Sequence, residues 1–595
     1  MKNIIPIFFA CDNNFFKFTL VTLKSIMDNA NPIYFYKIYV LNTDITPLNM
    51  DIARDFVNDN FSIEFPNVNE YLDSISDKLP IRDYYSKTTY FRFFISEMYK
   101  EYDKAIYIDS DTVVLGDISE LYNINLGDNL VGACNEQAML QNDIYGKYVE
   151  NNLGLDRTTY FNAGLLLINC QKFREECVLD QFINLLSVYN CKVTQDEDYL
   201  NIICYNKTKL IDNRWNTEIY GDIKYTDSEI KMIHYIMWCK PWHFLGVRLE
   251  KYFWKYAIKT PFYNEIKNIL DNYTDEERNR DLESSKRLER LAMDEIQRED
   301  TFINVKDKIG VKSVDRLKIS KKIMEYEEMG KFDQDVEQDP PTKELLPDQV
   351  DYLKKKVTSK AKTSLAYFIA RLYMNRLIKK ENMIIKEIKG VENLASLECG
   401  AIMTCNHFNA LDSFAIQVAY ESSITTRKER RKRRFYRVIR EGNYTSFNGF
   451  YGFLMRNCYT LPLSSNSKTM HKFLKSVSRI LQEGHLVLVY PEQSMWWNYR
   501  KPKPLKKGAF QFAVKNNVPV VPCFITMEDS DKIGPDGFNI QEYTIHISKP
   551  IYPDENKSYV ENVEYLMNEN YNEWVRIYES VYHEKLTYTT REASL

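Results

Sequence analysis

Short runs of consecutive apolar residues alternate with helix-periodic segments along the first 65 residues. A continuous apolar run at 4–10 predicts a strand that is buried on both faces, and further short strands are predicted at 38–41 and 62–65. Between them, residues 15–30 and 48–56 carry apolar side chains near helical spacing. This alternation predicts an α/β sheet with mostly parallel strands, and ligands bind such sheets beyond the carboxyl ends of the strands.

Two carboxylates, Asp109 and Asp111, follow a further apolar run at 105–108. If that run is a buried strand, both carboxylates leave its carboxyl end and can hold a hard divalent cation through their oxygens. Because turns are rich in aspartate, the pair alone is a weak signal. The segment ACDNN at 10–14 follows the first predicted strand, so we expect it at the same edge of the sheet.

Three later segments carry further polar side chains. FNAGLLLIN at 161–169 predicts a turn that feeds a buried strand. QDEDYLN at 195–201 places three consecutive acids at a predicted helix start, where acids also serve as partners of the helix dipole. His234 and Lys240 follow in HYIMWCKPWH. A single histidine is more often a core residue than a ligand, and a lysine beside a proline is usually part of a surface turn.

In chain order these segments resemble the retaining glycosyltransferase family 8, over about residues 1–265. The resemblance rests on the ordered series Ala10-x-Asp12-x-Asn14, Arg92, Asp109-Ser110-Asp111, FNAGLLLIN, QDEDYLN and HYIMWCKPWH. It implies a Rossmann-like fold of the GT-A type that binds a UDP-sugar, with Mn²⁺ or Mg²⁺ held by Asp109, Asp111 and His234. Such an ion neutralises the charge that develops on the diphosphate as the glycosidic bond breaks.

The same resemblance implies a role for the other residues of the series. The positions implied to bind the nucleotide sugar are Ala10, Asp12, Asn14, Arg92, Asn162 and Lys240. Asp196 and Glu197 are implied catalytic residues at the reacting face, where Glu197 is either a nucleophile or an electrostatic support. One position departs from the family, because Met237 stands where glycine is usual, three residues after His234.

A dense mixture of Lys, Arg, Glu and Asp fills residues 271–349 and predicts a charged helical connector, either a spacer or a docking segment. It separates two predicted domains, 1–270 and 350–595. The second domain begins with a basic amphipathic stretch at 350–388. Such a helix lies in a membrane interface or packs on an ordinary core, and this segment alone does not distinguish the two.

A second candidate site follows the predicted strand at 401–405. His407 and Asp412 lie five residues apart at its exit, so the carboxylate can orient the imidazole, which then acts as a general base for an alcohol. The chain continues with GFLMR at 452–456, VLVYPE at 487–492 and VPVVP at 518–522. This succession resembles the lysophosphatidate/glycerolipid acyltransferase family, over about residues 355–550.

The acyltransferase resemblance implies transfer from acyl-CoA or acyl carrier protein to a lipid hydroxyl, with His407 and Asp412 as catalytic residues. Arg456 and Glu492 match positions that bind the acceptor. The third block departs from the family, because the usual Pro-Glu-Gly-Thr-Arg is replaced by PEQSM at 491–495. Trp496 and Trp497 follow, and they suggest a different acceptor or anchoring at a membrane interface.

Composition limits the remaining possibilities. A chain of 595 residues with 44% hydrophobic and 27% charged residues predicts two or more globular domains. A net charge of −4 argues against a dedicated nucleic-acid binder. Because the basic run 427–440 lies inside the acyltransferase resemblance, it is expected to meet lipid head groups or a phosphorylated substrate, or to be a solvated face. Eleven cysteines without a CxxC pair indicate free thiols in a reducing cytoplasm. No apolar stretch is long enough to span a membrane, so any membrane contact is expected to be peripheral.

Together these features predict a bifunctional transferase of glycolipid or cell-envelope synthesis, cytoplasmic and bound peripherally to the inner face of the membrane. The expected partners are a nucleotide sugar, a lipid acceptor, the membrane surface and acyl carrier protein, with no nucleic acid. One alternative is an active glycosyltransferase whose acyltransferase-like half only binds membrane. Another is an acyltransferase that carries an inert sugar-binding module.

Overall fold

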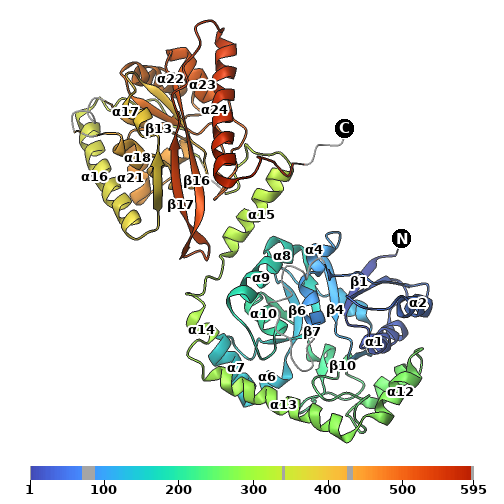
Figure 1. Ribbon diagram of the computed structural model, residues 1–595. Coiled ribbons are helices and arrows are strands. Elements are labelled where there is room, and N and C mark those ends of the chain that lie inside the picture. Colours follow the sequence, from blue (N-terminus) through green and yellow to red (C-terminus); the bar gives the residue numbers. More distant parts are fainter. Residues whose placement is uncertain (1, 70–86, 338–341, 425, 427–432, 591–595) are drawn as a thin grey trace. The chain divides into compact units, whose positions relative to one another are not determined.

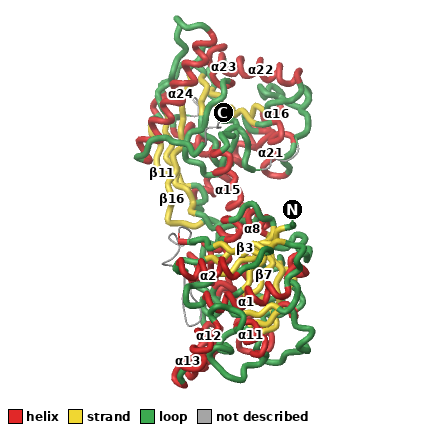
Figure 2. The backbone as a smooth tube through the Cα atoms, turned by 90° about the vertical axis from the view of Figure 1, so that its right-hand side faces the viewer, coloured by secondary structure: helices red, strands yellow, loops and turns green. Residues whose placement is uncertain are grey.

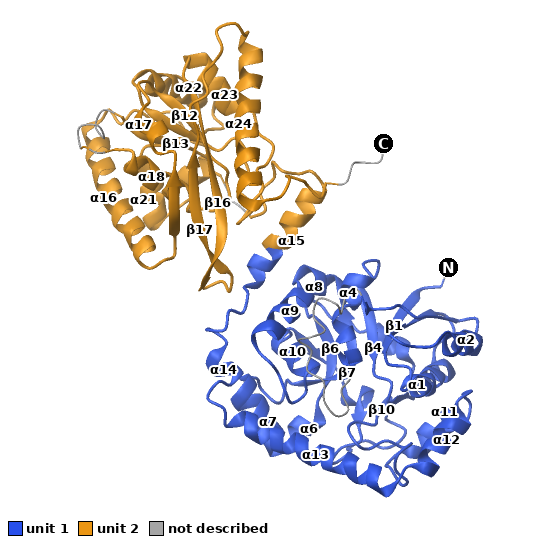
Figure 3. Cartoon of the chain, in the orientation of Figure 1, with its two compact units in different colours: residues 1–318 blue, residues 319–595 orange. Residues whose placement is uncertain are grey.

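The computed structural model describes residues 2–69, 87–337, 342–424, 426 and 433–590. The chain divides into two compact units, residues 1–318 and 319–595 (Figure 3). In each unit a sheet forms the centre and helices lie around it (Figure 2). The predicted two-domain α/β fold is therefore confirmed.

Two sheets organise the N-terminal unit. Their strands are β1 (Ile4–Ala10), β2 (Phe35–Leu41), β3 (Phe61–Glu64), β4 (Lys104–Ile108), β5 (Thr112–Val114), β6 (Val131–Asn135), β7 (Phe161–Asn169), β8 (Thr208–Leu210), β9 (Thr217–Glu218) and β10 (Met232–His234). The main sheet has the order β3-β2-β1-β4-β7-β6-β8, and β5, β10 and β9 form the smaller one (Figure 1). The first four strands of the main order run parallel, whereas β7 is antiparallel to β4 and β6.

Alternate side chains of the main sheet enter two cores, one on each face. Along β4, Ala105 and Tyr107 face one core, and Ile106 and Ile108 face the other. The helices of the unit are α1 (Phe16–Asn29), α2 (Pro47–Phe56), η2 (Lys87–Phe93), α4 (Ile95–Met98), α5 (Ile118–Tyr122), α6 (Gln137–Gln141), α7 (Asp143–Tyr148), η3 (Val149–Leu153), α8 (Cys170–Glu175), α9 (Val178–Val188), α10 (Asp196–Ile203), η4 (Asn213–Trp215), α11 (Glu250–Ala257), α12 (Tyr263–Asn272), α13 (Asp275–Ile296) and α14 (Phe302–Val305). The strands and helices predicted for the first 65 residues are confirmed within a few residues at each end.

The C-terminal unit contains a second seven-stranded sheet. Its strands are β11 (Ile384–Lys389), β12 (Ala401–Thr404), β13 (Phe435–Ile439), β14 (Thr460–Pro462), β15 (Leu486–Val489), β16 (Val520–Ile533) and β17 (Asn539–Ile547). They lie in the order β11-β17-β16-β12-β15-β13-β14, and only the β16–β17 pairing is antiparallel within the described residues (Figure 1). The carboxyl ends of the adjacent strands β12 and β15 therefore lie at one edge of the sheet.

Helices cover both faces of this sheet. They are α16 (Val357–Lys379), α17 (Glu392–Ala395), α18 (Asp412–Ser422), α20 (Glu441–Thr445), α21 (Gly449–Asn457), α22 (Ser467–Gln482), α23 (Gly508–Asn516) and α24 (Tyr559–Tyr582). Ala401 and Met403 of β12 face the core beneath α16 and α18, whereas Ile402 faces the core beneath α22, α23 and α24. Across the described part of the chain, none of the helices combines the length and the apolar character that crossing a membrane requires.

The charged stretch 271–349 contains the helices α13, α14 and α15 (Val314–Glu328) joined by turns, and the division between the units falls within α15. On one side of the division, Leu288 and Ala292 of α13 join a core of the N-terminal unit. On the other side, Ile323 and Val336 join a buried cluster of the C-terminal unit. The limits 1–270, 271–349 and 350–595 stay a prediction.

Trp496 and Trp497 belong to that same cluster, with exposed fractions of 0% and 9%. The expectation that they anchor the protein at a membrane interface is wrong, because their rings pack inside the unit. Phe332 stacks on Trp496 at a centroid distance of 5.5 Å, and Phe538 packs edge-on against Trp497 at 4.8 Å. The two tryptophans thus hold residues from the predicted connector and from the β16–β17 hairpin.

Candidate active sites

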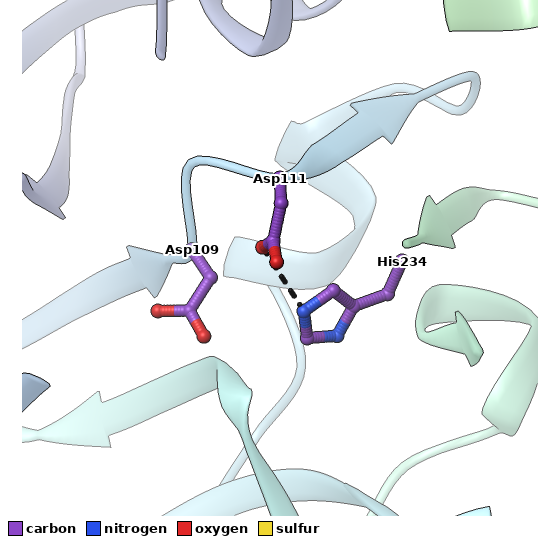
Figure 4. A group of neighbouring side chains, drawn as sticks. All are labelled: Asp109, Asp111 and His234. Atoms are coloured by element: carbon purple, nitrogen blue, oxygen red, sulfur yellow. Dashed lines mark hydrogen bonds and ion pairs between the residues drawn. The ribbon is translucent and has the colours of Figure 1, made fainter. Parts of the chain in front are cut away.

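The first candidate site lies where β1 and β4 end side by side. β1 connects onward to β2 on one side and pairs with β4 on the other, so the strand order reverses at this point, where parallel sheets bind ligands. Ser110 is buried and bonds Thr19 of α1 through its hydroxyl at 2.8 Å. Asp109 and Asp111, on either side of Ser110, point into a common space with His234 (Figure 4).

One ligand atom from each of Asp109, Asp111 and His234 can be chosen so that all three lie within 4.8 Å of one another. Two carboxylates and an imidazole form a donor set that suits Mn²⁺ or another divalent cation of similar hardness. Gly164 of β7 makes room for them, because a Cβ there would lie 2.3 Å from His234 Cε1 and 2.9 Å from Asp109 Oδ2. The glycine of FNAG is therefore a steric requirement of this cluster.

A chain of buried amides orients His234. Asn216 donates through Nδ2 to Asn162 Oδ1 at 2.8 Å, so its own Oδ1 lies 3.1 Å from His234 Nδ1. This arrangement places the imidazole proton on Nδ1 and leaves the Nε2 lone pair toward the carboxylates, as a metal ligand needs. Asn162 thus acts on the cluster through Asn216.

Lys240 lies inside the cluster rather than on a surface turn. It is buried, and its ammonium group donates to Asp111 Oδ2 and to the Tyr235 carbonyl oxygen. Although burial opposes ionisation, the charge of Lys240 lowers the pKa of Asp111 below its usual range. Met237 has a φ of 53°, so methionine keeps a left-handed backbone at the position where the family pattern has glycine.

Arg92 is buried and connects the carboxylate of Asp109 with that of Asp196. Its Nη2 donates to Asp109 Oδ1 at 3.1 Å, and its Nε lies 3.2 Å from Asp196 Oδ2. The same Nε donates to the Thr89 carbonyl oxygen at 2.9 Å, and Nη1 donates to the Ala163 carbonyl oxygen. Burial raises the pKa of Asp196 to about 7, although Arg92 opposes the rise.

Glu197 lies in a group of buried carboxyls. It accepts a hydrogen bond from the Ala163 N–H at 2.8 Å, and burial together with the charge of Glu136 raises its pKa well above the ordinary value. Burial and the charge of Glu136 also raise the pKa of Glu218 well above its ordinary value. Among the described residues, Oε1 of Glu218 has no hydrogen-bond partner. The choice between nucleophile and electrostatic support for Glu197 stays a prediction.

The three predicted nucleotide positions follow β1. Ala10 is its last residue and half-buried, Asp12 accepts from the Phe15 N–H at 2.8 Å, and Asn14 is exposed in the turn before α1. They border the same strand ends as Asp109, and their contacts with a uridine stay a prediction.

The second candidate site joins the ends of β12 and β15. His407 Nδ1 lies 2.7 Å from Asp412 Oδ2, and Tyr490 donates to Asp412 Oδ1 at 2.7 Å. The Asp412 side chain is 1% exposed and that of His407 24% exposed. When the imidazole donates its Nδ1–H to the Asp412 carboxylate, Nε2 stays available as a proton acceptor, which is the arrangement of a general base.

The predicted acceptor-binding residues are engaged within the protein. Arg456 donates to the Tyr444 and Phe447 carbonyl oxygens at 3.2 and 2.8 Å. Glu492 is 2% exposed, and its two oxygens accept from the backbone N–H groups of His407 and Lys503 at 2.9 and 2.8 Å. Their binding of an acceptor stays a prediction. Of the basic run 427–440, residues 427–432 lie outside the described residues, and Arg440 donates to the Gln493 carbonyl oxygen at 2.6 Å.

Comparison with known proteins agrees with both parts of the chain. The model of glycosyl transferase family 8 matches residues 6–246, and the model of the acyltransferase family matches residues 386–526. Residues 6–246 are therefore similar to family 8 glycosyltransferases, and residues 386–526 to acyltransferases. Both resemblances predicted from the sequence are confirmed.

Individual relatives match the N-terminal part. A lipopolysaccharide 1,3-galactosyltransferase of Salmonella typhimurium is 29% identical over 202 residues, 31% of this chain and 58% of that protein. Glycosyltransferase GlyB of Streptococcus pneumoniae is 29% identical over 277 residues, 43% of this chain and 62% of that protein. The matches thus span less than two thirds of these relatives. Among solved structures, the WbbM bifunctional glycosyltransferase is 26% identical with a TM-score of 0.40, covering 45% of this chain and 52% of that one.

Several residues of both sites escaped the sequence analysis. In the first site they are Glu136, Asn216 and Glu218, and in the second Tyr490 and Lys503. Tyr490 directly follows the apolar run 486–489, which forms β15, a position that could have singled it out. The others become visible only from contacts between segments far apart in the chain.

Proposed function

We propose that the chain is a bifunctional transferase of glycolipid or cell-envelope synthesis. The N-terminal unit would move a hexosyl group from a UDP-sugar with retention, and the C-terminal unit would move an acyl group from acyl-CoA or acyl carrier protein to a lipid hydroxyl. The observation that supports it most is the paired assembly of a cation-binding cluster in one unit and an oriented histidine in the other.

In the sugar transfer, Mn²⁺ or Mg²⁺ held by Asp109, Asp111 and His234 would supply positive charge to the diphosphate leaving group. Lys240 would add the positive charge of its ammonium group at the diphosphate oxygens. Asp196 and Glu197 line the reacting face with carboxyl groups whose pKa values are raised. The bond from the anomeric carbon to the diphosphate would break, the acceptor oxygen would form the new bond on the same face of the sugar, and the hydroxyl proton would pass to the leaving diphosphate oxygen.

In the acyl transfer, the lipid hydroxyl attacks the thioester carbonyl carbon while His407 Nε2 takes its proton. Asp412 and Tyr490 hold the resulting imidazolium. The carbon–sulfur bond then breaks, and the proton leaves with the thiol. The alternative, in which this half only binds membrane, does not explain why His407, Asp412 and Tyr490 are joined by hydrogen bonds.

The test incubates the full chain with Mn²⁺, a panel of UDP-sugars, acyl-CoA or acyl carrier protein and membrane lipids, and follows label into extracted lipid. Asp111→Ala should abolish sugar transfer alone, and His407→Ala acyl transfer alone. Absence of acyl transfer by the parent protein with every donor would support the membrane-module alternative. Unchanged activities in Asp111→Ala would support the inert sugar module.

We also propose that α16 and α21 contact the inner face of the membrane. Leu365, Phe368 and Leu372 are 51%, 61% and 56% exposed on the outer side of α16, and Phe450 and Tyr451 of α21 are 41% and 46% exposed. Tyr373 links the two groups, because its ring lies 5.1 Å from that of Phe450. Exposed cations surround this apolar surface, namely Lys360, Lys362, Arg376, Lys379 and Lys380.

An apolar surface with a basic border suits anionic lipid head groups. The inner side of α16 packs on the core through Ala366, Met374 and Leu377, which leaves its outer side for the proposed membrane contact. Phe368→Ser with Leu372→Ser should weaken sedimentation with vesicles that contain phosphatidylglycerol. Ile258→Ser, at a similarly exposed residue of the N-terminal unit, is the control. Equal binding by all three proteins would contradict the proposal.

A further inference from the structure

The third acyltransferase block holds the backbone on both sides of His407. Glu492 Oε2 accepts from the His407 N–H at 2.9 Å, and the Trp496 N–H donates to the His407 carbonyl oxygen at 3.2 Å. The peptide groups that flank His407 are therefore both bound to residues 492–496. The position of the imidazole is thereby tied to the position of this block.

Lys503 supports the block from within. Its side chain is 1% exposed, its Nζ donates to the carbonyl and hydroxyl oxygens of Ser494 at 2.8 Å each, and it lies 3.5 Å from Glu492 Oε2. Its own N–H binds the other oxygen of Glu492 at 2.8 Å. Burial raises the pKa of Glu492 and lowers that of Lys503, so each depends on the other to stay charged.

Residues 332–335 support the block from the other side. Ser494 donates through its hydroxyl to the Phe332 carbonyl oxygen. The Met495 N–H donates to Asp335 Oδ1 at 3.0 Å, and Trp496 Nε1 donates to the Gln334 carbonyl oxygen at 2.7 Å. These contacts fall on the residues that replace the Thr-Arg of the family pattern and on the tryptophan that follows. Here the altered block binds a segment of its own unit.

We infer that residues 332–335, Trp496 and Lys503 are positioning residues that set His407 for acyl transfer, with Glu492 as the link between them. The inference rests on the proposed acyltransferase function. It reassigns Glu492 from contact with the acceptor to support of the catalytic loop. The sequence change at 493–495 then replaces a ligand contact by an internal support and need not inactivate the site.

The first experiment separates positioning from packing. Trp496→Phe keeps the ring stack on Phe332 and removes the hydrogen bond to Gln334, so kcat for acyl transfer should fall about tenfold while KM for the acyl donor stays within about twofold. Trp574→Phe is the matched control, because Trp574 is equally buried and its Nε1 has no hydrogen-bond partner. A kcat for Trp496→Phe no lower than that of Trp574→Phe would overturn the inference.

The second experiment uses Asp335. Asp335→Ala should lower kcat about as much as Trp496→Phe, and Asp335→Asn, which keeps an oxygen for the Met495 N–H, should recover most of it. Equal losses in both Asp335 variants would overturn the role of that hydrogen bond.

A third readout needs no turnover. The low-field proton resonance of His407 Nδ1, identified by its loss in His407→Gln, should shift in Trp496→Phe and Asp335→Ala but not in Trp574→Phe. If the parent protein transfers no acyl group, the proposed function fails and this resonance still tests the positioning. An unshifted resonance in both variants would overturn the inference itself.

Discussion

In the N-terminal unit Asp111 meets His234 across 123 residues, whereas in the C-terminal unit Asp412 meets His407 across five. Asp111 pairs with the ammonium group of Lys240, and Nε2 of His234 is directed at it. Asp412 instead accepts from a tyrosine hydroxyl and from backbone N–H groups of Phe408 and Asn409. In the first site the Nε2 lone pair and the carboxylate oxygens together form a possible ligand set for a cation. In the second site the Nε2 lone pair is free to accept a proton from the substrate.

The difference shows what each aspartate–histidine pair can do. Two carboxylates and an imidazole lone pair converge on one point and can hold a cation. A carboxylate bound to the histidine Nδ1 raises the basicity of Nε2 and fixes its direction. In the described ranges of the chain, Asp109, Asp111 and His234 are the one group of three or more such side chains with ligand atoms this close.

Removal of divalent metal should produce the largest separation of the two activities. EDTA should lower sugar transfer by about 10³-fold or more, because the diphosphate leaving group loses its counter-charge, and leave acyl transfer within about twofold. Added Mn²⁺ should restore sugar transfer. The measurement is transfer of labelled sugar and labelled acyl group by one protein preparation. Equal losses of both activities would remove the distinction between the sites.

Glu197 offers the next largest effect. Glu197→Gln should keep sugar transfer within about tenfold, because an amide resembles the protonated carboxyl and still accepts from the Ala163 N–H. Glu197→Ala should lose about 10²-fold. The kcat of both variants with the preferred UDP-sugar decides the matter. A loss of about 10⁴-fold or more in Glu197→Gln would instead identify Glu197 as the nucleophile.

Glu218 should control how the stability of the N-terminal unit depends on pH. Its pKa in the folded protein is raised, so its favourable contribution is present below pH ~4.5 and is lost as pH rises toward the folded pKa. Glu218→Gln should therefore raise the free energy of unfolding by about 1–3 kcal/mol at pH 8 and change it little at pH 4.

Calorimetric unfolding at both pH values measures this effect, with exposed Glu299→Gln as the control. The same change at pH 4 and pH 8 would contradict the role of the buried proton.

The smallest effect should come from the two positions where the family pattern has glycine. Met237 and Gln493 have φ values of 53° and 66°, which cost L-residues about 1 kcal/mol each relative to glycine. Met237→Gly and Gln493→Gly should therefore raise the thermal midpoint of the protein by a few degrees. Asn516→Gly, a substitution in the helix α23, should lower the thermal midpoint and serves as the control. Destabilisation by both glycine substitutions would show that the side chains contribute more than the backbone strain costs.

Patterns local in the sequence predicted much of both sites. The strands before Asp109 and His407 follow from uninterrupted apolar runs, and the pairing of His407 with Asp412 from their spacing. Contacts that depend on sheet order could not be predicted, because Asn216 reaches His234 only through the pairing of β9 with β10.

The environment of the tryptophans was misjudged for the same reason. Their partners Phe332 and Phe538 lie 164 and 41 residues away, one of them in a stretch with few apolar residues. A pair of large aromatic side chains carries no local sign of whether water, lipid or protein will cover it.

The packing of residues 319–336 against Trp496 limits where the chain can be divided to separate the two proposed activities. A C-terminal fragment that begins at Val350 would lack Phe332 and so expose part of the Trp496 ring, at a cost of about 1–2 kcal/mol, while Tyr499 would still pack against the ring. A fragment that begins before α15 would keep that cover. In a gene fusion, the acyltransferase would therefore be inherited as a working piece only together with the charged stretch that precedes it.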